Sequence, residues 1–283
     1  MTTKKIAFVT DSTVFLTEQL RSHPDVYIVP MVVISDGIEY DDANLTSDKL
    51  YDIIRSEKEI PKTSQPNSNK FHEQYEQLKE NYDQAIAIHV SSELSGTLSS
   101  SDAGKNQANF SVEIIDSLSL SYGITDLLTE GLALAEKGVE VPVIASRLRE
   151  RAAHGRNLIL LGSLEQLYKG GRMSGAQFLL GNLLKIKPIL SITSTGKLEL
   201  KERIRSEKKA INRLIALIKE SNQVKNVKEV GIMHGNALEK ARDLSDRINK
   251  EIPNLTTVIG EISSSLAVHA GEGTVAVFWN EGK

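Results

Sequence analysis

Residues Ala85 to Leu98 read AIAIHVSSELSGTL, and the fold can be worked out from this stretch. Its first half, Ala85 to Val90, has the length and β-branching of a buried strand. A serine-rich loop follows over Ser91 to Thr97, and the residues from Leu98 to Ala103 predict a helix. Free N–H groups and hydroxyls at such a turn suit an anion, but serine is also an ordinary helix cap. This stretch alone leaves both interpretations open.

Similar apolar runs lie on both sides of the stretch from Ala85 to Leu98. Strands are predicted near residues 6–10, 26–34 (interrupted by Pro30) and 112–115, with helices between them. Such alternation is typical of βα units joined into a parallel sheet, whose ligands lie outside the carboxyl ends of the strands. We therefore expect Asp11-Ser12, Thr63-Ser64 and Ser92 to Thr97 to gather at that edge, although each segment also has an ordinary role as a cap or turn.

The pattern changes near residue 154. The segments 187–192 and 197–203 flank Thr193-Ser194-Thr195-Gly196, which is typical of a β-hairpin, and further strands are predicted at 227–233, 256–262 and 274–279. Strands joined partly by hairpins predict a mixed or largely antiparallel sheet. We therefore expect an α/β protein of two domains, with a parallel-sheet domain over residues 1–153 and a second α/β domain over 154–283.

Composition narrows the classes of function. The chain has 283 residues, 40% hydrophobic content and a net charge of -3, so no overall basic field indicates a nucleic-acid partner. Cysteine is absent, which excludes disulfides and cysteine nucleophiles and agrees with a cytoplasmic protein. The six histidines show no metal-ligand spacing, so no metal site is expected. No apolar run approaches the roughly 20 residues of a membrane span, so we expect no integral membrane segment.

Several loops carry residues with binding chemistry. Pro61 and Pro66 bracket a stiff extended loop that contains Thr63, and His269 lies in a short helix that ends at glycines. Arg172 follows two glycines in a basic loop, and the leucine-rich stretch 178–184 either lines a cleft or is a plain core helix.

Three functions fit these residues. Ser95 activated by His269 is one possible nucleophile, but the surrounding sequence is not the GxSxG elbow of a serine hydrolase. Phosphate-binding loops are a second possibility, but neither GxxxxGK[ST] nor a GxGxxG after a strand is present. In the third, hydroxyls and a histidine hold the carboxylate of a ligand whose body lies in an apolar cleft.

Four motifs taken together resemble the DegV family, the fatty-acid-binding subunits of bacterial fatty acid kinase. They are Val9-Thr10-Asp11-Ser12-Thr13, Lys62-Thr63-Ser64-Gln65-Pro66, Ser91-Ser92-Glu93-Leu94-Ser95-Gly96-Thr97 and Gly170-Gly171-Arg172-Met173-Ser174. The resemblance extends to Val268-His269-Ala270-Gly271 and so covers nearly the whole chain. One departure is Gly271-Glu272-Gly273, where the family typically has Gly-Pro-Gly, which we expect to loosen the loop and to add a negative charge beside His269.

The resemblance implies a two-domain α/β protein with a fatty acid enclosed between the domains. Thr63 and Ser95 would hold the carboxylate, with Gly96 beside Ser95 and His269 close by. The ligand would be a long-chain acid of about C16 to C18, in which each buried methylene contributes about 0.8 kcal/mol. No cofactor is implied.

The resemblance also implies that the protein does not catalyse a reaction by itself. It would present the carboxylate to a separate ATP-dependent fatty acid kinase, and the acyl phosphate made there would feed phospholipid synthesis. Arg172 and Arg203 are the candidates for docking that kinase or facing the phosphate. The alternative from a different class is a stand-alone serine-type acyl hydrolase or acyltransferase that uses Ser95 and His269.

Overall fold

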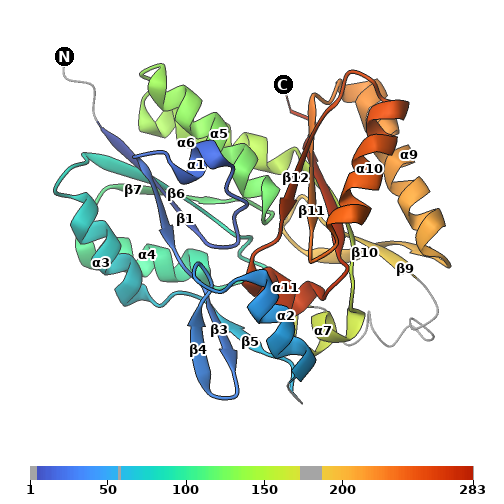
Figure 1. The fold of residues 1–283 in the computed structure, drawn as a ribbon. Helices are drawn as coiled ribbons and strands as arrows, with labels where there is room; N and C mark the ends of the chain where they lie inside the picture. Colours follow the sequence, from blue (N-terminus) through green and yellow to red (C-terminus); the bar gives the residue numbers. More distant parts are fainter. Residues whose placement is uncertain (1–4, 57–58, 173–186, 283) are drawn as a thin grey trace.

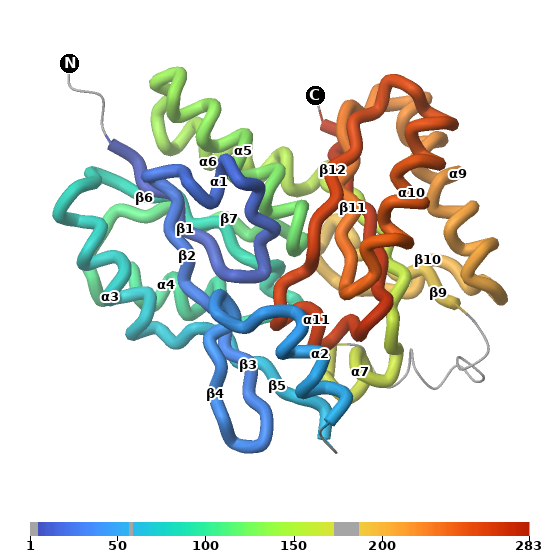
Figure 2. Tube along the Cα trace, in the orientation of Figure 1, coloured from blue at the N-terminus to red at the C-terminus, as the bar shows by residue number. Residues whose placement is uncertain are grey.

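The computed structural model describes residues 5–56, 59–172 and 187–282. Within these ranges the chain forms three sheets, and Figures 1 and 2 show two lobes with the small third sheet at the lower side of the view. The first sheet has the order β2-β1-β6-β7, and every neighbouring pair is parallel. Its strands are β1 (Ile6–Asp11), β2 (Val26–Val29), β6 (Gln84–His89) and β7 (Val112–Asp116).

Helices cover both faces of this sheet, as the sequence AIAIHV requires. Ile86 and Ile88 pack under α5 (Tyr122–Glu136) and α6 (Val141–Ala153), whereas Ala85 and Ala87 face α3 (Ser68–Leu78) and α4 (Thr97–Ala108). Alternate side chains of a strand point to opposite faces, so the branched residues fill one layer and the alanines admit the aromatic rings of α3 in the other. A short helix, α1 (Glu18–Arg21), follows β1.

The second sheet has the order β10-β9-β8-β13-β11-β12, in which only β11 and β12 are parallel neighbours. Its strands are β8 (Gly155–Leu160), β9 (Lys187–Ile192), β10 (Leu198–Ile204), β11 (Glu229–His234), β12 (Thr256–Glu261) and β13 (Val275–Asn280). The parallel first sheet and this mixed second sheet confirm the predicted fold class. The hairpin of β9 and β10 is also confirmed. A boundary between residues 153 and 154 stays a prediction; α6 ends at Ala153 and β8 begins at Gly155.

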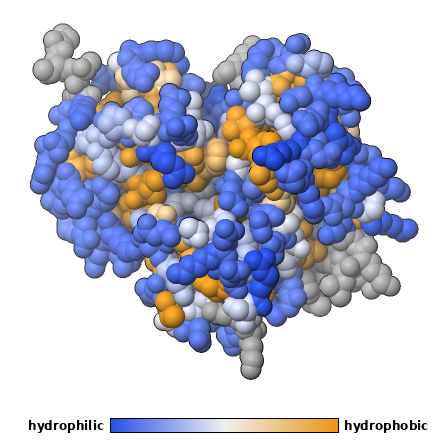
Figure 3. All heavy atoms as spheres, in the orientation of Figure 1, coloured by the Kyte–Doolittle hydropathy of each residue, from blue (hydrophilic) through white to orange (hydrophobic). Residues whose placement is uncertain are grey.

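The two faces of the second sheet have different partners. One face packs against α9 (Glu207–Lys225) and α10 (Leu238–Glu251). The other face packs against α7 (Leu164–Lys169) and α11 (Ser264–Ala270), together with side chains from the N-terminal half such as Val33 and Tyr51. The core on this second face is therefore built from both halves of the chain. In Figure 3, apolar side chains show along the junction of the two lobes, whereas most of the surrounding surface is hydrophilic.

The small third sheet was not predicted. It has the order β4-β3-β5, with β3 (Val32–Ser35), β4 (Ile38–Asp41) and β5 (Lys62–Ser64) all antiparallel, and α2 (Ser47–Ser56) lies between β4 and β5 in the sequence. The run 26–34 therefore forms two strands in two different sheets, separated at Pro30, which cannot donate a ladder hydrogen bond. The predicted loop at 61–68 is likewise partly a strand, because its extended backbone pairs with β3.

Candidate functional site

The candidate site is a pocket between the two halves, enclosing about 810 Å³ of space, part of which is open to solvent. Most of its walls are apolar side chains from both halves of the chain. They are Met31, Val90, Leu94, Leu120, Ile159, Leu161, Leu167, Leu198, Ile262, Leu266, Ala270, Ala276 and Phe278. An apolar lining with a few polar groups among it is typical of a site for a small organic molecule.

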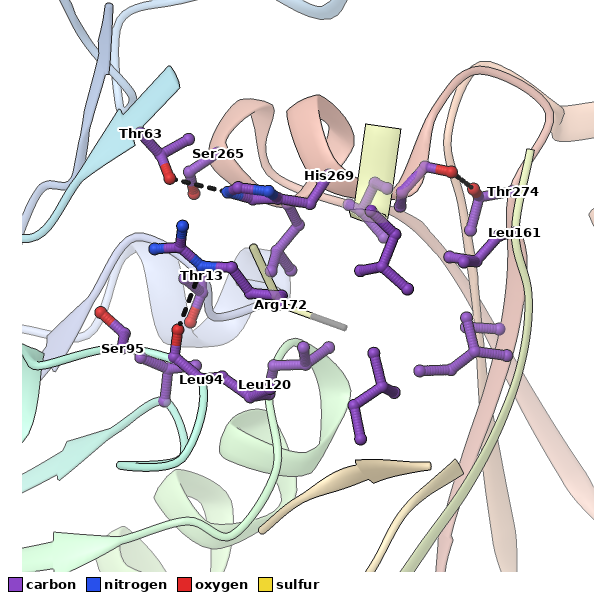
Figure 4. Close-up of a pocket in the computed structure, with 18 of the residues that line it drawn as sticks. Thr13, Thr63, Leu94, Ser95, Leu120, Leu161, Arg172, Ser265, His269 and Thr274 are labelled. Carbon is purple, nitrogen blue, oxygen red and sulfur yellow. Dashed lines mark hydrogen bonds between the residues drawn. The ribbon is translucent and has the colours of Figure 1, made fainter. Parts of the chain in front are cut away.

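The polar side chains gather at one end. Figure 4 shows Thr63, Ser95, Arg172 and His269 there, whereas Leu161 and Thr274 lie at the opposite end. The Thr274 hydroxyl is already engaged by backbone groups, since it donates to the carbonyls of Ala270 and Gly271. The pocket is therefore amphipathic, with one polar end and a long apolar body.

Thr63 and His269 form a direct contact across 206 residues of sequence, with 2.7 Å between Thr63 Oγ1 and His269 Nε2. Strand β5 explains why Thr63 faces the pocket. Its neighbours Lys62 and Ser64 point to the exposed side, as strand alternation requires. Burial and the nearby Arg172 lower the pKa of His269 to about 4, so the imidazole is neutral at pH 7. A neutral imidazole retains one N–H donor.

Glycine is required at the two positions before Arg172 for different structural reasons. A Cβ at Gly170 would lie 2.8 Å from His269 Cε1 and closer still to Nδ1, so only glycine allows the loop to pack against the imidazole. Gly171 has a φ of +74°, in the left-handed region that glycine adopts most easily. Together they turn the chain so that Arg172 points into the polar end of the pocket.

Arg172 is half-buried and, within the described ranges, has no carboxylate partner. Its Nη1 donates to the carbonyl of Gly170 (2.7 Å) and its Nε to that of Leu94 (3.4 Å). Burial lowers its pKa, because a guanidinium loses hydration there. The two carbonyls carry only partial charges, so the polar end of the pocket keeps an unbalanced positive charge.

Ser95 lines the pocket, but it does not cap α4. The N-cap residue is Gly96, and among the described residues no side chain caps the first turn, so the interpretation of this loop as a serine cap is wrong. Ser95 Oγ instead lies 2.8 Å from Thr97 Oγ1. Gly96 does not line the pocket; it lies at the groove beside it, where a Cβ would collide with the side chain of Gln65.

The structure brings Thr63, Ser95, Arg172 and His269 together but leaves Arg203 apart. Arg203 is an exposed residue of β10 and does not line the pocket. The stretch 178–184 lies outside the described residues. Two hydroxyl residues at the pocket, Thr13 and Ser265, were not predicted there. Both follow the carboxyl end of a strand, where α/β sheets commonly bind ligands, and this position in the sequence could have indicated them as pocket residues.

A second histidine network lies behind the pocket and was not predicted. His89 Nδ1 lies 3.3 Å from Asp11 Oδ2, and His89 Nε2 lies 2.8 Å from Ser101 Oγ. Burial alone would raise the pKa of Asp11, but His89, the Thr13 hydroxyl and the Val90 N–H lower it. Asp11, His89 and Ser101 are linked in the order of a catalytic Asp-His-Ser triad. All three are fully buried, however, and none of them lines the pocket. Their contacts join β1 and β6 to helix α4.

Two further properties concern the described ranges only. No group of three or more histidine, aspartate or glutamate side chains is arranged there to hold a metal ion. No helix in the same ranges is long and apolar enough to cross a membrane.

Comparison with known proteins gives one consistent result. Residues 5–282 match the DegV family, whose description reads uncharacterised protein. A DegV domain-containing protein of Halalkalibacterium halodurans is 32% identical over 282 residues, covering 97% of this chain and 98% of that protein.

Solved structures show the same similarity. A fatty-acid-binding DegV family protein from Streptococcus agalactiae has a TM-score of 0.92 and 30% identity, covering 99% of this chain and 100% of that one. The Streptococcus pneumoniae fatty acid kinase B3 protein, solved with linoleic acid, has a TM-score of 0.85 over 98% of this chain and 100% of that one. Its 20% identity shows a shared fold only.

Proposed function

This chain belongs to the DegV family, and from that premise we propose that it binds a long-chain fatty acid in the pocket between its two halves. The observation that carries the proposal is the division of the pocket into a long apolar body and a single polar end. A fatty acid has the same division. A DegV protein of similar structure that is described as fatty-acid-binding supports the assignment.

In the proposed complex, the carboxylate lies among Thr63, Ser95, Arg172 and His269. Burying a carboxylate without partners costs several kcal/mol or more, so the ligand needs donors at this end. Two hydroxyls and a neutral imidazole supply them, and Arg172 supplies a positive charge that has no carboxylate partner among the described residues. Each methylene in the apolar body adds about 0.8 kcal/mol, so a chain of about C16 to C18 supplies ample affinity.

We further propose that the protein is a carrier subunit, which presents the carboxylate to a separate ATP-dependent kinase for acyl phosphate formation. The motifs shared with the family support this role, in which Arg203 on β10 and Arg172 at the polar end of the pocket are the candidates for docking the kinase or facing the phosphate. The contacts of the site disfavour a serine hydrolase. Ser95 Oγ is hydrogen-bonded to Thr97 and not to His269, whose low pKa makes it a weak base at pH 7.

The decisive experiment is native mass spectrometry of the purified protein, followed by lipid extraction. We expect one fatty acid per chain. The double variant Thr63→Ala, Ser95→Ala should bind a fluorescent fatty acid such as cis-parinaric acid more weakly than wild type. Its matched control is Ser64→Ala, Ser99→Ala, because these exposed serines lie beside the same elements but outside the pocket. Equal affinity of the two double variants would show that the carboxylate lies elsewhere.

The carrier role is tested separately. Wild-type protein, ATP and a purified fatty acid kinase should together form acyl phosphate, and neither protein should do so alone. Arg203→Ala should slow that reaction without changing fatty-acid affinity. Hydrolysis of acyl esters by the protein alone, abolished in Ser95→Ala, would instead establish the hydrolase.

A further inference from the structure

The helix that carries His269 has no cap of its own. Helix α11 begins after Ser263, whose side chain makes no capping hydrogen bond. An acceptor comes instead from Asp42, which lies more than 200 residues earlier, between β4 and α2. Asp42 Oδ1 accepts the backbone N–H of Ser265 at 2.8 Å, which is the position that an N-cap side chain normally fills.

The carboxylate of Asp42 is fully engaged at this point. Its Oδ2 accepts the hydroxyls of Ser265 (2.7 Å) and Ser12 (2.5 Å), and only 5% of the residue is exposed. Ser12 in turn accepts the N–H of Met31, a residue of the pocket wall. One buried side chain therefore links the end of β1, the start of β3 and the first turn of α11.

A second contact beside it holds the same turn, because the Ser264 hydroxyl donates to the carbonyl of Leu45 at 2.9 Å. Ser265 and His269 are four residues apart on α11, so they lie on the same face, and both line the pocket. Fixing Ser265 therefore fixes both the rotation of α11 and the direction of the imidazole.

We propose that Asp42 is a positioning residue for the ligand site, which caps α11 from the other half of the chain and so holds His269 against Thr63. The proposal rests on the proposed function in one respect, namely that His269 contacts the fatty acid. In this arrangement Asp42 does not touch the ligand; it acts through Ser265 and the helix.

The test compares Asp42→Ala with Asp41→Ala. Asp41 is the last residue of β4, and its side chain accepts the local N–H of Ala43 and, among the described residues, bonds to no part of α11, so it is a matched control. In Asp42→Ala we expect fatty-acid affinity to fall about ten-fold, as for the loss of one buried hydrogen-bond partner. Asp41→Ala should bind cis-parinaric acid like wild type.

A second readout does not need the ligand. The His269 imidazole is followed by NMR titration and assigned with His269→Gln. Its pKa should move in Asp42→Ala from about 4 toward the ordinary value of 6.5, because the loosened ring gains water and moves away from Arg172. A purely structural role would lower the unfolding temperature and leave this pKa unchanged in the folded protein.

Asp42→Asn keeps the shape of the side chain and covers the case in which Asp42→Ala does not fold. Its amide nitrogen cannot accept hydroxyls, so we expect changes in the same direction but smaller. Wild-type affinity and wild-type His269 titration in the folded Asp42 variants would overturn the proposal. Failure of the wild-type protein to bind any fatty acid would overturn the proposed function, and the titration alone would then decide the role of Asp42.

Discussion

Replacing Gly170 by alanine is the sharpest test of the polar end of the pocket. Its backbone φ is negative, so alanine is tolerated there conformationally, and the effect comes from the added methyl group alone. That methyl would lie 2.8 Å from His269 Cε1, whereas ordinary van der Waals contacts begin at 3.4 Å. The ring and the loop must therefore move apart, by about 0.6 Å at Cε1 to reach an ordinary contact and by more at Nδ1.

Such a movement disturbs the 2.7 Å contact between His269 and Thr63, on which the proposed carboxylate site depends. A hydrogen bond to a charged group contributes about 1.5–3 kcal/mol. We therefore expect Gly170→Ala to raise the Kd for a long-chain fatty acid about 10- to 100-fold. Fluorescence titration with cis-parinaric acid measures the Kd, and circular dichroism measures the unfolding temperature of the same samples.

Gly138→Ala is the matched control. Gly138 lies in the turn between α5 and α6 with a φ of +72° and open space around it. Alanine there strains the backbone by about 1–2 kcal/mol, so stability should fall while the Kd stays unchanged. The reasoning is refuted if Gly170→Ala binds as tightly as wild type, or if it loses only stability, as Gly138→Ala should.

Three further predictions follow from the charges of the site and its surroundings. Arg172→Gln should weaken fatty-acid binding more than Arg172→Lys, which keeps the positive charge; equal losses in a binding titration would mean that Arg172 acts through packing alone. Burial lowers the pKa of His269 to about 4, so the imidazole is protonated at a higher pH in the unfolded chain than in the folded one. The free energy of unfolding should therefore fall by up to about 3 kcal/mol between pH 6.5 and pH 4. In denaturant unfolding at the two pH values, His269→Gln should lose less unfolding free energy than wild type by that amount. Equal losses in the two proteins would contradict the assignment of this pH dependence to His269. Glu272 should stiffen its loop through its hydrogen bonds with Arg55 and Asn236. Glu272→Ala and Arg55→Ala should therefore each speed fatty-acid release slightly at low salt, as measured by stopped-flow fluorescence. No change in the release rate at low salt, or the same change at high salt, would exclude this role.

Glu272 has two side-chain contacts that the sequence did not predict. A glutamate between two glycines was expected to loosen the loop after His269. Its carboxylate instead accepts hydrogen bonds from Arg55 on α2 at 2.9 Å and from Asn236 after β11 at 2.6 Å. Neither partner could be identified from the sequence, because nothing local to residues 271–273 indicates which distant side chains face them.

The elements that were predicted correctly are those whose structure is indicated by residues close to one another in the sequence. The apolar run Ala85 to Val90 predicted a buried strand, and both faces of that strand are buried in the structure. The elements that were missed depend on a distant partner. Strand β5 is three residues long and exists because β3, which lies about thirty residues earlier, pairs with it.

The sequence by itself determined the βα units, the change to hairpins near residue 154, and the residue types available for an anion. These properties follow from side-chain periodicity and backbone preference over a few neighbouring residues. Only the tertiary structure decided that Thr63 meets His269, that Arg172 lacks a carboxylate partner within the described ranges, and that Asp42 caps α11. Each of these depends on groups far apart in the chain, whose hydrogen bonds and desolvation are set by the packing of the two halves.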